Sequence, residues 1–215
     1  MIEVFVTSFD TELPATVLAR HLDSLPEEMR NSINRYKRWQ DRHRALLARL
    51  LLRAGLQAFG FPAEALGSVR LDAFGRPFLS QEVDFNISHS GSYIFCALAC
   101  GQRVGIDIEA VRRIELIDFC SAFSQEEWLV INRASDPHAA FFNLWTRKES
   151  AGKADGRGLT IPLEQIVLND STARIGNTVW HLAPIRIHPA YIAHLATDGR
   201  IDFKLTELVI SILLH

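Results

Sequence analysis

The sequence predicts an α+β fold made of two similar halves. In each half a strand comes first, helical segments that end in one long helix follow, and a set of strands closes the half. This repeated order indicates an internal duplication, although the halves share no residue-level repeat. At 215 residues with 48% hydrophobic content, the chain can bury a substantial core. We expect the halves to be residues 1–104 and 105–215, with a ligand cleft where they meet.

The first half opens with an apolar segment, Ile2 to Ser8, whose β-branched and aromatic residues predict a strand. Helices are expected near Ala15–Leu22 and from Pro26 onward. A longer helix is predicted from about Asp41 to Phe59, because Leu, Ala and Arg, which dominate there, are good helix formers. The sequence Gly60-Phe61-Pro62 ends that helix.

Positive charge gathers around the long helix. Between Arg30 and Arg53 the basic residues are Arg35, Lys37, Arg38, Arg42, Arg44 and Arg49. As a cluster they favour a negatively charged partner, whereas the solvated face of a helix explains each one alone. The formal net charge of −2 argues against general electrostatic binding to nucleic acid. Any anion-binding site must therefore be local.

The rest of the first half predicts two strands around polar segments. Val69–Leu71 favours a short strand, and Ala73–Pro77 favours the turn after it. Asp84–Gly91 is expected to be a tight polar segment before an apolar strand over Tyr93–Ala99. The adjacent Ser88-His89 pair suits hydrogen bonding to a phosphate better than hydrolysis, because a nucleophile and its base usually come from distant positions.

Two motifs in the second half bring carboxylates together. Asp107 and Glu109 alternate with apolar residues, so a half-buried strand would project both from one face. Glu149 and Lys153 are four residues apart in a run without proline, so a helix would place them on one stripe. Carboxylate clusters suit Mg²⁺, which takes further ligands from water and substrate phosphates, and a nearby lysine suits a phosphate oxygen. The alternative is a solvated strand face beside an ordinary helix salt bridge.

Local signals predict the remaining elements of the second half. A helix is expected over Ile114–Phe119. Ser124 and Glu127 have the spacing of a capping box, which gives Glu127 a structural explanation. The pair Asp136-Pro137 opens the long helix that carries the second carboxylate motif. From Ile166 to His215, short alternating runs predict strands.

Cysteine usage and the N-terminus indicate a soluble, cytoplasmic protein. Cys96, Cys100 and Cys120 are odd in number and lack CxxC spacing, which fits free thiols in a reducing compartment. The first residues lack the basic region of a signal peptide, and no apolar stretch is long enough to cross a bilayer. We therefore expect no membrane partner.

Four sequence blocks occur in the order found in a known family. They are Gly75-Arg76-Pro77, Phe85-Asn86-Ile87-Ser88-His89-Ser90, Gly105-Ile106-Asp107-Ile108-Glu109 and Trp145-x-x-Lys148-Glu149-x-x-x-Lys153-x-x-Gly156-x-Gly158-Leu159. Through these blocks the chain resembles the monomeric, Sfp-type 4′-phosphopantetheinyl transferases. The joint occurrence of four ordered blocks favours the functional interpretation of the carboxylates, since each block alone is a weak signal.

The resemblance implies transfer of the 4′-phosphopantetheine arm of coenzyme A to a serine of an acyl or peptidyl carrier protein. Adenosine 3′,5′-bisphosphate would be released, coenzyme A would be the co-substrate and Mg²⁺ the cofactor. The implied fold is a monomer whose two α+β halves are related by a pseudo-twofold axis, with the active site at their interface.

The resemblance also assigns roles to individual residues. The Mg²⁺ ligands would be Asp107, Glu109 and Glu149. Coenzyme A would contact Arg44, Gly75, Arg76, Pro77, Ser88, His89 and Lys153. Catalytic roles would fall to Glu149, Lys153 and Glu127. Both glutamates of that last group are candidates for the general base, and the sequence does not choose between them.

The chain departs from the family pattern at two positions, and two other functions stay open. Arg76 stands where many relatives carry lysine, which keeps the charge but changes the donor geometry. Glu28 stands where a lysine is expected. One alternative is a Mg²⁺-dependent phosphodiesterase that acts on a nucleotide or on coenzyme A, with water as the nucleophile. The other is a protein that binds coenzyme A or a carrier domain without catalysis.

Overall fold

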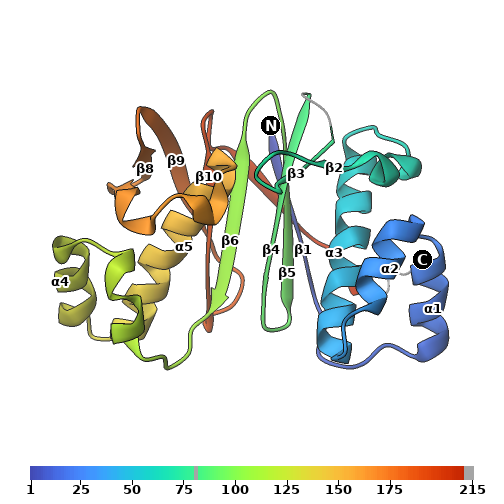
Figure 1. Ribbon diagram of the computed structural model, residues 1–215, viewed down its shortest axis with the longest axis horizontal. Coiled ribbons are helices and arrows are strands. Elements are labelled where there is room, and N and C mark those ends of the chain that lie inside the picture. Colours follow the sequence, from blue (N-terminus) through green and yellow to red (C-terminus); the bar gives the residue numbers. More distant parts are fainter. Residues whose placement is uncertain (80–81, 211–215) are drawn as a thin grey trace.

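The computed structural model describes residues 1–79 and 82–210, which form a mixture of helices and sheets (Figure 1). The first half contains β1 (Ile2–Ser8), α1 (Ala15–Asp23), α2 (Glu27–Asn34), α3 (Trp39–Ala58), η1 (Ala63–Ser68), β2 (Arg70–Leu71), β3 (Pro77–Phe78), β4 (Val83–Ser90) and β5 (Tyr93–Cys100). The second half contains β6 (Val104–Ala110), η2 (Leu116–Ala122), α4 (Gln125–Arg133), α5 (Pro137–Asp155), η3 (Gly158–Thr160), η4 (Leu163–Gln165), β7 (Val167–Leu168), β8 (Thr172–Ile175), β9 (Thr178–Ile185), β10 (Tyr191–Thr197) and β11 (Phe203–Glu207). The predicted α+β class is confirmed.

Two sheets stand in the centre of the molecule, with α3 on one outer flank and α5 on the other (Figure 1). The strand order is β11-β1-β5-β4 in the first sheet and β6-β10-β9-β8-β7 in the second. Strand β11 pairs with β1 in parallel, with Ile2 opposite Phe203. The C-terminal strand β11 therefore returns to the sheet that holds the first strand.

The apolar core fills the spaces between these layers. Val4 and Val6 of β1 face Ile106 and Ile108 of β6 across a core that lies between the two sheets. Phe5 points to the opposite side of its sheet, where it packs in the helical cluster of the first half. This alternation of successive side chains is the pattern of strands that are buried on both faces.

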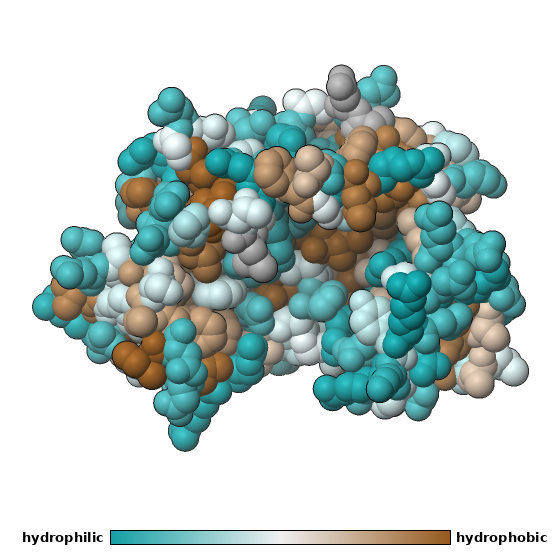
Figure 2. Space-filling model, viewed as in Figure 1, coloured by the Kyte–Doolittle hydropathy of each residue, from teal (hydrophilic) through white to brown (hydrophobic). Residues whose placement is uncertain are grey.

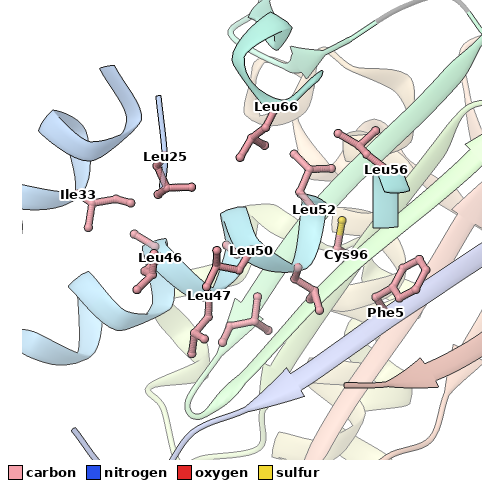
Figure 3. Packing of buried hydrophobic residues seen from close by; sticks show 14 of the residues in the cluster. Phe5, Leu25, Ile33, Leu46, Leu47, Leu50, Leu52, Leu56, Leu66 and Cys96 are labelled. Atoms are coloured by element: carbon pink, nitrogen blue, oxygen red, sulfur yellow. The ribbon is translucent and has the colours of Figure 1, made fainter. Parts of the chain in front are cut away.

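Helix α3 supplies much of the core of the first half. Its fully buried leucines are Leu46, Leu47, Leu50, Leu51 and Leu56. Figure 3 shows how leucines of α3 converge with Phe5 and Cys96 from the sheet below. Burial of each such side chain stabilises the fold by about 1.5–3 kcal/mol. Gly55 permits the close approach, because a Cβ there would lie 2.5 Å from Leu98 Cδ1.

The two sheets meet along β4 and β6 without backbone pairing between these strands. Four backbone N–H groups of β6 donate to side-chain oxygens of β4. The pairs are Val104 to Asp84 at 2.8 Å, Ile106 to Asn86 at 2.9 Å, Ile108 to Ser88 at 3.4 Å and Ala110 to Ser90 at 3.0 Å. Side chains two residues apart on a strand share one face, so one polar face of β4 satisfies alternate amides of β6. We call this arrangement the β4–β6 seam.

Most predicted elements are confirmed, with two corrections. The prediction of a tight polar segment over Asp84–Gly91 is wrong, because Val83–Ser90 is a strand whose polar residues face the seam. The helix predicted over Ile114–Phe119 is instead a 3-10 helix over Leu116–Ala122. Part of the predicted C-terminal strand region, residues 211–215, lies outside the described residues. None of the helices in the described ranges combines the length and apolar content that a bilayer crossing requires.

Candidate active site

Strand β6 and helix α5 approach each other closely at Gly105. A Cβ at this position would lie 2.1 Å from the backbone oxygen of Ser150 and 2.4 Å from the backbone nitrogen of Ala154. Glycine is therefore the residue that allows the helix to lie against the strand. The carboxylates of β6 consequently face the side chains of Glu149 and Lys153 on α5.

Lys153, Asp107 and Ser88 form a hydrogen-bonded triangle that joins three elements. Lys153 Nζ lies 2.6 Å from Asp107 Oδ1 and donates to Ser88 Oγ at 3.1 Å. The Ser88 hydroxyl lies 3.0 Å from the same Asp107 oxygen and donates to it. The Asp107 side chain is only 6% exposed, so the ion pair is largely removed from water. The triangle connects α5 to β6 and, across the seam, to β4.

Two carboxylate oxygens in this cluster are buried without a hydrogen-bond partner, Asp107 Oδ2 and Glu149 Oε1. Burial raises the pKa of Asp107, although the Lys153 ammonium opposes this effect. Burial, followed by the negative charge of Asp107, raises the pKa of Glu149. Because a buried carboxylate oxygen without a partner is costly, the site favours a bound cation or a proton donor at these oxygens.

Glu109 extends the cluster toward solvent. Its Oε2 accepts hydrogen bonds from Ser90 Oγ at 2.9 Å and from Arg112 Nη1 at 3.2 Å. The Glu109 side chain is 25% exposed, so it is less withdrawn from water than Asp107. Within residues 1–79 and 82–210, no three His, Cys, Asp or Glu side chains are grouped as a ready-made metal site. The predicted face of β6 nevertheless holds both carboxylates beside Glu149.

A pocket of about 440 Å³ lies on the α3 side of β4. Its apolar wall comes from Ala45, Ala48, Leu52, Val69, Leu71, Pro77, Phe85 and Ile87, and its polar residues include Tyr36, Arg44, Arg49 and His89. All of its lining residues belong to the first half, and Figure 2 shows a hollow with hydrophobic walls, coloured brown, on this face of the molecule. We call this cavity the α3 pocket.

The α3 pocket is lined by two arginines, Arg44 and Arg49, and by one carboxylate, Asp41. Arg44 Nη1 lies 2.8 Å from Asp41 Oδ1, so Arg44 already has a counter-ion. Arg49 donates to the backbone oxygen of Ala45 at 3.1 Å and forms no ion pair within the described part of the chain. Partial burial, followed by the Arg44 guanidinium, lowers the pKa of His89. Apolar walls with a cationic rim suit a flat aromatic group that carries an anion.

Ser88 and His89 connect the two features. They are neighbours on β4, and successive side chains of a strand point to opposite faces. Ser88 therefore contacts Asp107 at the carboxylate cluster, while His89 lines the α3 pocket. The charges of Lys153 and Glu109 act on His89, so the two features are neighbours on either side of one strand.

Two family models match the chain and together cover most of it. Residues 103–210, about half of the chain, match a model described as the 4′-phosphopantetheinyl transferase superfamily. Residues 15–101 match a model described as the N-terminal part of a 4′-phosphopantetheinyl transferase. The chain belongs to the 4′-phosphopantetheinyl transferase superfamily.

Individual phosphopantetheinyl transferases are similar over most of their length. The 4′-phosphopantetheinyl transferase gsp of Aneurinibacillus migulanus is 34% identical over 166 residues, which are 76% of this chain and 69% of gsp. The 4′-phosphopantetheinyl transferase Sfp of Bacillus subtilis (strain 168) is 32% identical over 149 residues, 67% of this chain and 66% of Sfp. A protein of Haemophilus influenzae named as a putative 4′-phosphopantetheinyl transferase is 31% identical over 218 residues. The matched region is 87% of this chain and 90% of the Haemophilus influenzae protein.

The resemblance seen in the four sequence blocks is thus confirmed. As a phosphopantetheinyl transferase, the chain is an enzyme that transfers the phosphopantetheine group to carrier proteins, with coenzyme A as the co-substrate. The phosphodiesterase alternative has no support among these relatives.

In this phosphopantetheinyl transferase the side chain of Arg76 lies in the seam. Its Nη2 donates to Asp84 Oδ2 at 2.7 Å and to the backbone oxygen of Val104 at 2.8 Å. Of the segment Gly75-Arg76-Pro77, Pro77 lines the α3 pocket. Gly75 has φ of 79°, a left-handed conformation that favours glycine and turns the chain between β2 and β3. The segment therefore shapes the pocket mainly through its backbone and Pro77.

Two partners engage the carboxylate of Glu127. Its Oε2 accepts from the backbone N–H of Ser124 at 2.8 Å, as the predicted capping box requires. The same oxygen lies 2.7 Å from Lys148 Nζ, whose side chain is 1% exposed. Lys148 also donates to the backbone oxygens of Ala122 and Leu163. The ion pair joins α4 to α5, and the two hydrogen bonds of Lys148 join the 3-10 helices η2 and η4 to α5.

Two residues that line the α3 pocket, Arg49 and Tyr36, have no site role assigned from the sequence. Arg49 belonged to the basic cluster around the long helix, but nothing in its local sequence separated it from solvated arginines. Tyr36 lies just before α3 and lines the same pocket. A four-residue spacing from Ala45 to Arg49 on a helix was the available signal, since it places Arg49 on the face that carries the buried Ala45.

Proposed function

We propose that coenzyme A binds across β4, with its nucleoside and 3′-phosphate in the α3 pocket and its pyrophosphate beside the carboxylate cluster. The observation that carries this proposal is the placement of Ser88 and His89 on opposite faces of one strand, each contacting one of the two features. Arg44, Arg49 and His89 would then contact the nucleotide end, and Pro77 the base. The arm would be transferred to a serine of the carrier protein with release of adenosine 3′,5′-bisphosphate.

We further propose that Asp107, Glu109 and Glu149 hold Mg²⁺. The unpartnered oxygens Asp107 Oδ2 and Glu149 Oε1 fit such an ion, because oxygen ligands from carboxylates are what Mg²⁺ prefers. When bound, the ion would neutralise charge on the pyrophosphate and polarise its oxygens. The Lys153 ammonium, already held between Asp107 and Ser88, would contribute a second positive charge at the same place.

Glu149 is the general base we favour for the serine hydroxyl. Its carboxylate lies in the cluster and accepts no hydrogen bond from a described residue, so an oxygen that does not bind the ion is free to take the serine proton. Glu127, the other candidate, has its Oε2 engaged by Lys148 and by the N–H of Ser124. We therefore propose that Glu127 supports the reaction by fixing α5, and that Glu149 acts on the acceptor serine.

We also propose that the chain is divided into halves at residues 1–104 and 105–215 and acts as a cytoplasmic monomer. A boundary at residues 104 and 105 is supported by the junction of the two family models between residues 101 and 103. We propose a monomer, because both features come from one chain and neither requires a second copy. A reducing, cytoplasmic location is supported by Cys96, which is a buried free thiol.

The test is the intact mass of a purified apo acyl carrier protein after incubation with the enzyme, coenzyme A and Mg²⁺. We expect a gain of one phosphopantetheine group that is lost with a chelator and with a carrier whose acceptor serine is replaced by alanine. A gain that persists in chelator would contradict the metal proposal alone. Coenzyme A breakdown without any modified carrier would contradict the transfer itself.

A further inference from the structure

A second pocket lies beside α5, and none of the residues of the carboxylate cluster line it. Its volume is about 690 Å³, and it is bounded by α5, the turn between β7 and β8, strands β9 and β10, and the loop that joins these two strands. The residues that carry its chemistry are Asn143, Arg147, Asp170, Arg186, His188 and His194. We call it the α5 pocket, and none of the roles proposed above uses it.

The α5 pocket has more positive than negative charge. Arg147 and Arg186 both line it, and neither forms an ion pair within the described residues. Arg147 instead donates to the backbone oxygens of Asn169 and Asp170, which orients its guanidinium and leaves further N–H groups available. Asp170 is the carboxylate of this pocket. In a chain with net charge −2, this local excess of arginine favours an anionic ligand.

His194 gives the pocket a hydrogen-bond acceptor. Its Nδ1 lies 2.8 Å from Thr146 Oγ1, and that hydroxyl lies 2.8 Å from the backbone oxygen of Phe142. The single hydroxyl hydrogen of Thr146 goes to the carbonyl, which only accepts, so the hydroxyl oxygen must accept from Nδ1–H of His194. The neutral ring therefore has its free lone pair on Nε2. No hydrogen bond to Nε2 is found among the described residues, although the His194 residue is only 5% exposed.

His188 supplies a hydrogen-bond donor to the same pocket. Its Nδ1 accepts from the backbone N–H of Ala190 at 3.1 Å, so a neutral ring carries its hydrogen on Nε2. The pocket thus combines arginine and imidazole donors with one imidazole acceptor. Its remaining walls include Pro184, Ile185 and Ile192, which are apolar. A free phosphate ion would leave most of this volume and the acceptor unused.

We propose that the α5 pocket binds a small phosphate monoester that carries a free hydroxyl group. The phosphate would accept from Arg147 and Arg186, since guanidinium groups match phosphate oxygens in geometry and charge. The hydroxyl would donate to His194 Nε2. The ligand site is separate from the coenzyme A site, and its occupancy does not depend on the roles proposed for the carboxylates.

The experiment uses the full chain, labelled with ¹⁵N and saturated with coenzyme A so that the α3 pocket is filled. Glycerol 3-phosphate is titrated while the side-chain signals of His194 and Arg147 are followed by NMR. We expect saturable shifts, much weaker binding of glycerol and of methyl phosphate, and an unbound spectrum in which His194 is protonated on Nδ1. Unchanged signals at millimolar glycerol 3-phosphate, or a free ring protonated on Nε2, would overturn the proposal.

A pair of variants separates the pocket from general charge effects. Arg186→Gln should weaken binding of glycerol 3-phosphate by about tenfold or more, as expected for loss of one charged hydrogen bond. Arg174→Gln is the matched control, because Arg174 is an exposed arginine on β8 outside the pocket. Equal affinities of the two variants would refute the assignment. Both positions are exposed, so neither change is expected to disturb folding.

Discussion

Lys153 Nζ lies 2.6 Å from Asp107 Oδ1, and both groups contact the hydroxyl of Ser88. The ion pair uses one oxygen of Asp107 and leaves the other, Oδ2, buried without a partner. A cation at that oxygen would therefore share Asp107 with Lys153. If Mg²⁺ binds there as proposed, it would lie next to the Lys153 ammonium, and the two positive charges would face the same negatively charged substrate group.

Loss of the Lys153 ammonium should slow transfer. We expect Lys153→Ala to reduce turnover on the order of 10²-fold or more, by analogy with removal of one donor that stabilises developing negative charge. The matched control is Arg157→Ala, which removes an exposed cation just beyond α5. Initial rates of carrier modification at saturating coenzyme A measure the effect. An unchanged rate in Lys153→Ala would show that the residue is structural.

Loss of Asp107 should remove both activity and metal response. In the wild-type protein we expect Mg²⁺ with coenzyme A to raise the thermal unfolding midpoint, because ligands that bind the native state stabilise it. Asp107→Ala should abolish that shift and cut turnover severely while circular dichroism stays native. Near-normal turnover in a folded Asp107→Ala protein would count against the metal assignment.

The two candidate bases should behave differently. Glu149→Gln should lower turnover by roughly 10²–10⁴-fold, the usual contribution of a general base, with little loss of stability. Glu127→Gln should instead cost about 3–5 kcal/mol of unfolding free energy, because it leaves the buried Lys148 without its counter-ion. Urea unfolding and initial rates of folded protein measure the two effects.

A double variant tests the structural role of Glu127. Glu127→Gln with Lys148→Met replaces the ion pair by groups that need no counter-charge, so most of the stability should return. Turnover per folded molecule should then stay close to wild type. Recovery of stability with a persistent loss of roughly 10²-fold or more in turnover would identify Glu127 as the base instead.

Gly105→Ala should separate β6 from α5. The new Cβ would lie 2.1 Å from the backbone oxygen of Ser150, and the backbone of a helix cannot yield cheaply. We expect a loss of at least about 1–3 kcal/mol in unfolding free energy together with loss of turnover. Gly67→Ala is the control, since its Cβ would meet only Pro26 Cγ at 3.6 Å. Equal stabilities of the two variants would contradict the close packing.

His194 should make the protein sensitive to acid. Burial, followed by the Arg147 guanidinium, lowers the pKa of His194 from 6.5 to about 3. In the unfolded chain the His194 ring takes up a proton below about pH 6.5, whereas in the folded chain it stays neutral down to about pH 3. Its contribution to the free energy of unfolding is therefore fully present above pH 6.5 and is lost as the pH falls from 6.5 to 3. The loss should reach up to about 5 kcal/mol once the pH has fallen to about 3.

The comparison that checks this acid sensitivity uses two histidine variants. Unfolding free energies between pH 7 and pH 4 should fall less steeply for His194→Gln than for the wild type, because glutamine does not titrate. His181→Gln, at an exposed position of β9, should keep the wild-type slope. Identical slopes for all three proteins would show that His194 is not a buried neutral ring.

Local sequence patterns predicted the helices and most strands well, because their signals lie within a few residues. The capping box of Ser124 and Glu127 and the Asp136-Pro137 helix start are both present as expected. Strand β4 was missed although Val83, Phe85 and Ile87 alternate with polar residues. The polar residues were interpreted as a turn because the seam that satisfies them is formed with a separate strand.

The parts of the site that the sequence left open depend on contacts between distant residues. Alternation alone placed Asp107 and Glu109 on one face, and helical spacing placed Glu149 beside Lys153. Neither pattern indicates that Lys148 is buried against Glu127, a contact across 21 positions that occupies one oxygen of this candidate base. The parallel pairing of β11 with β1 is likewise absent from any local pattern.

The β4–β6 seam has a consequence for how the two halves are aligned. A slide of β4 by one residue would present Phe85 and Ile87 to the amides of β6, and those side chains accept no hydrogen bonds. A slide by two residues would restore some polar contacts but would carry Ser88 away from Asp107. The seam therefore fixes the register of β4 against β6. The side chains that hold the two sheets together also set the position of Ser88 relative to Asp107.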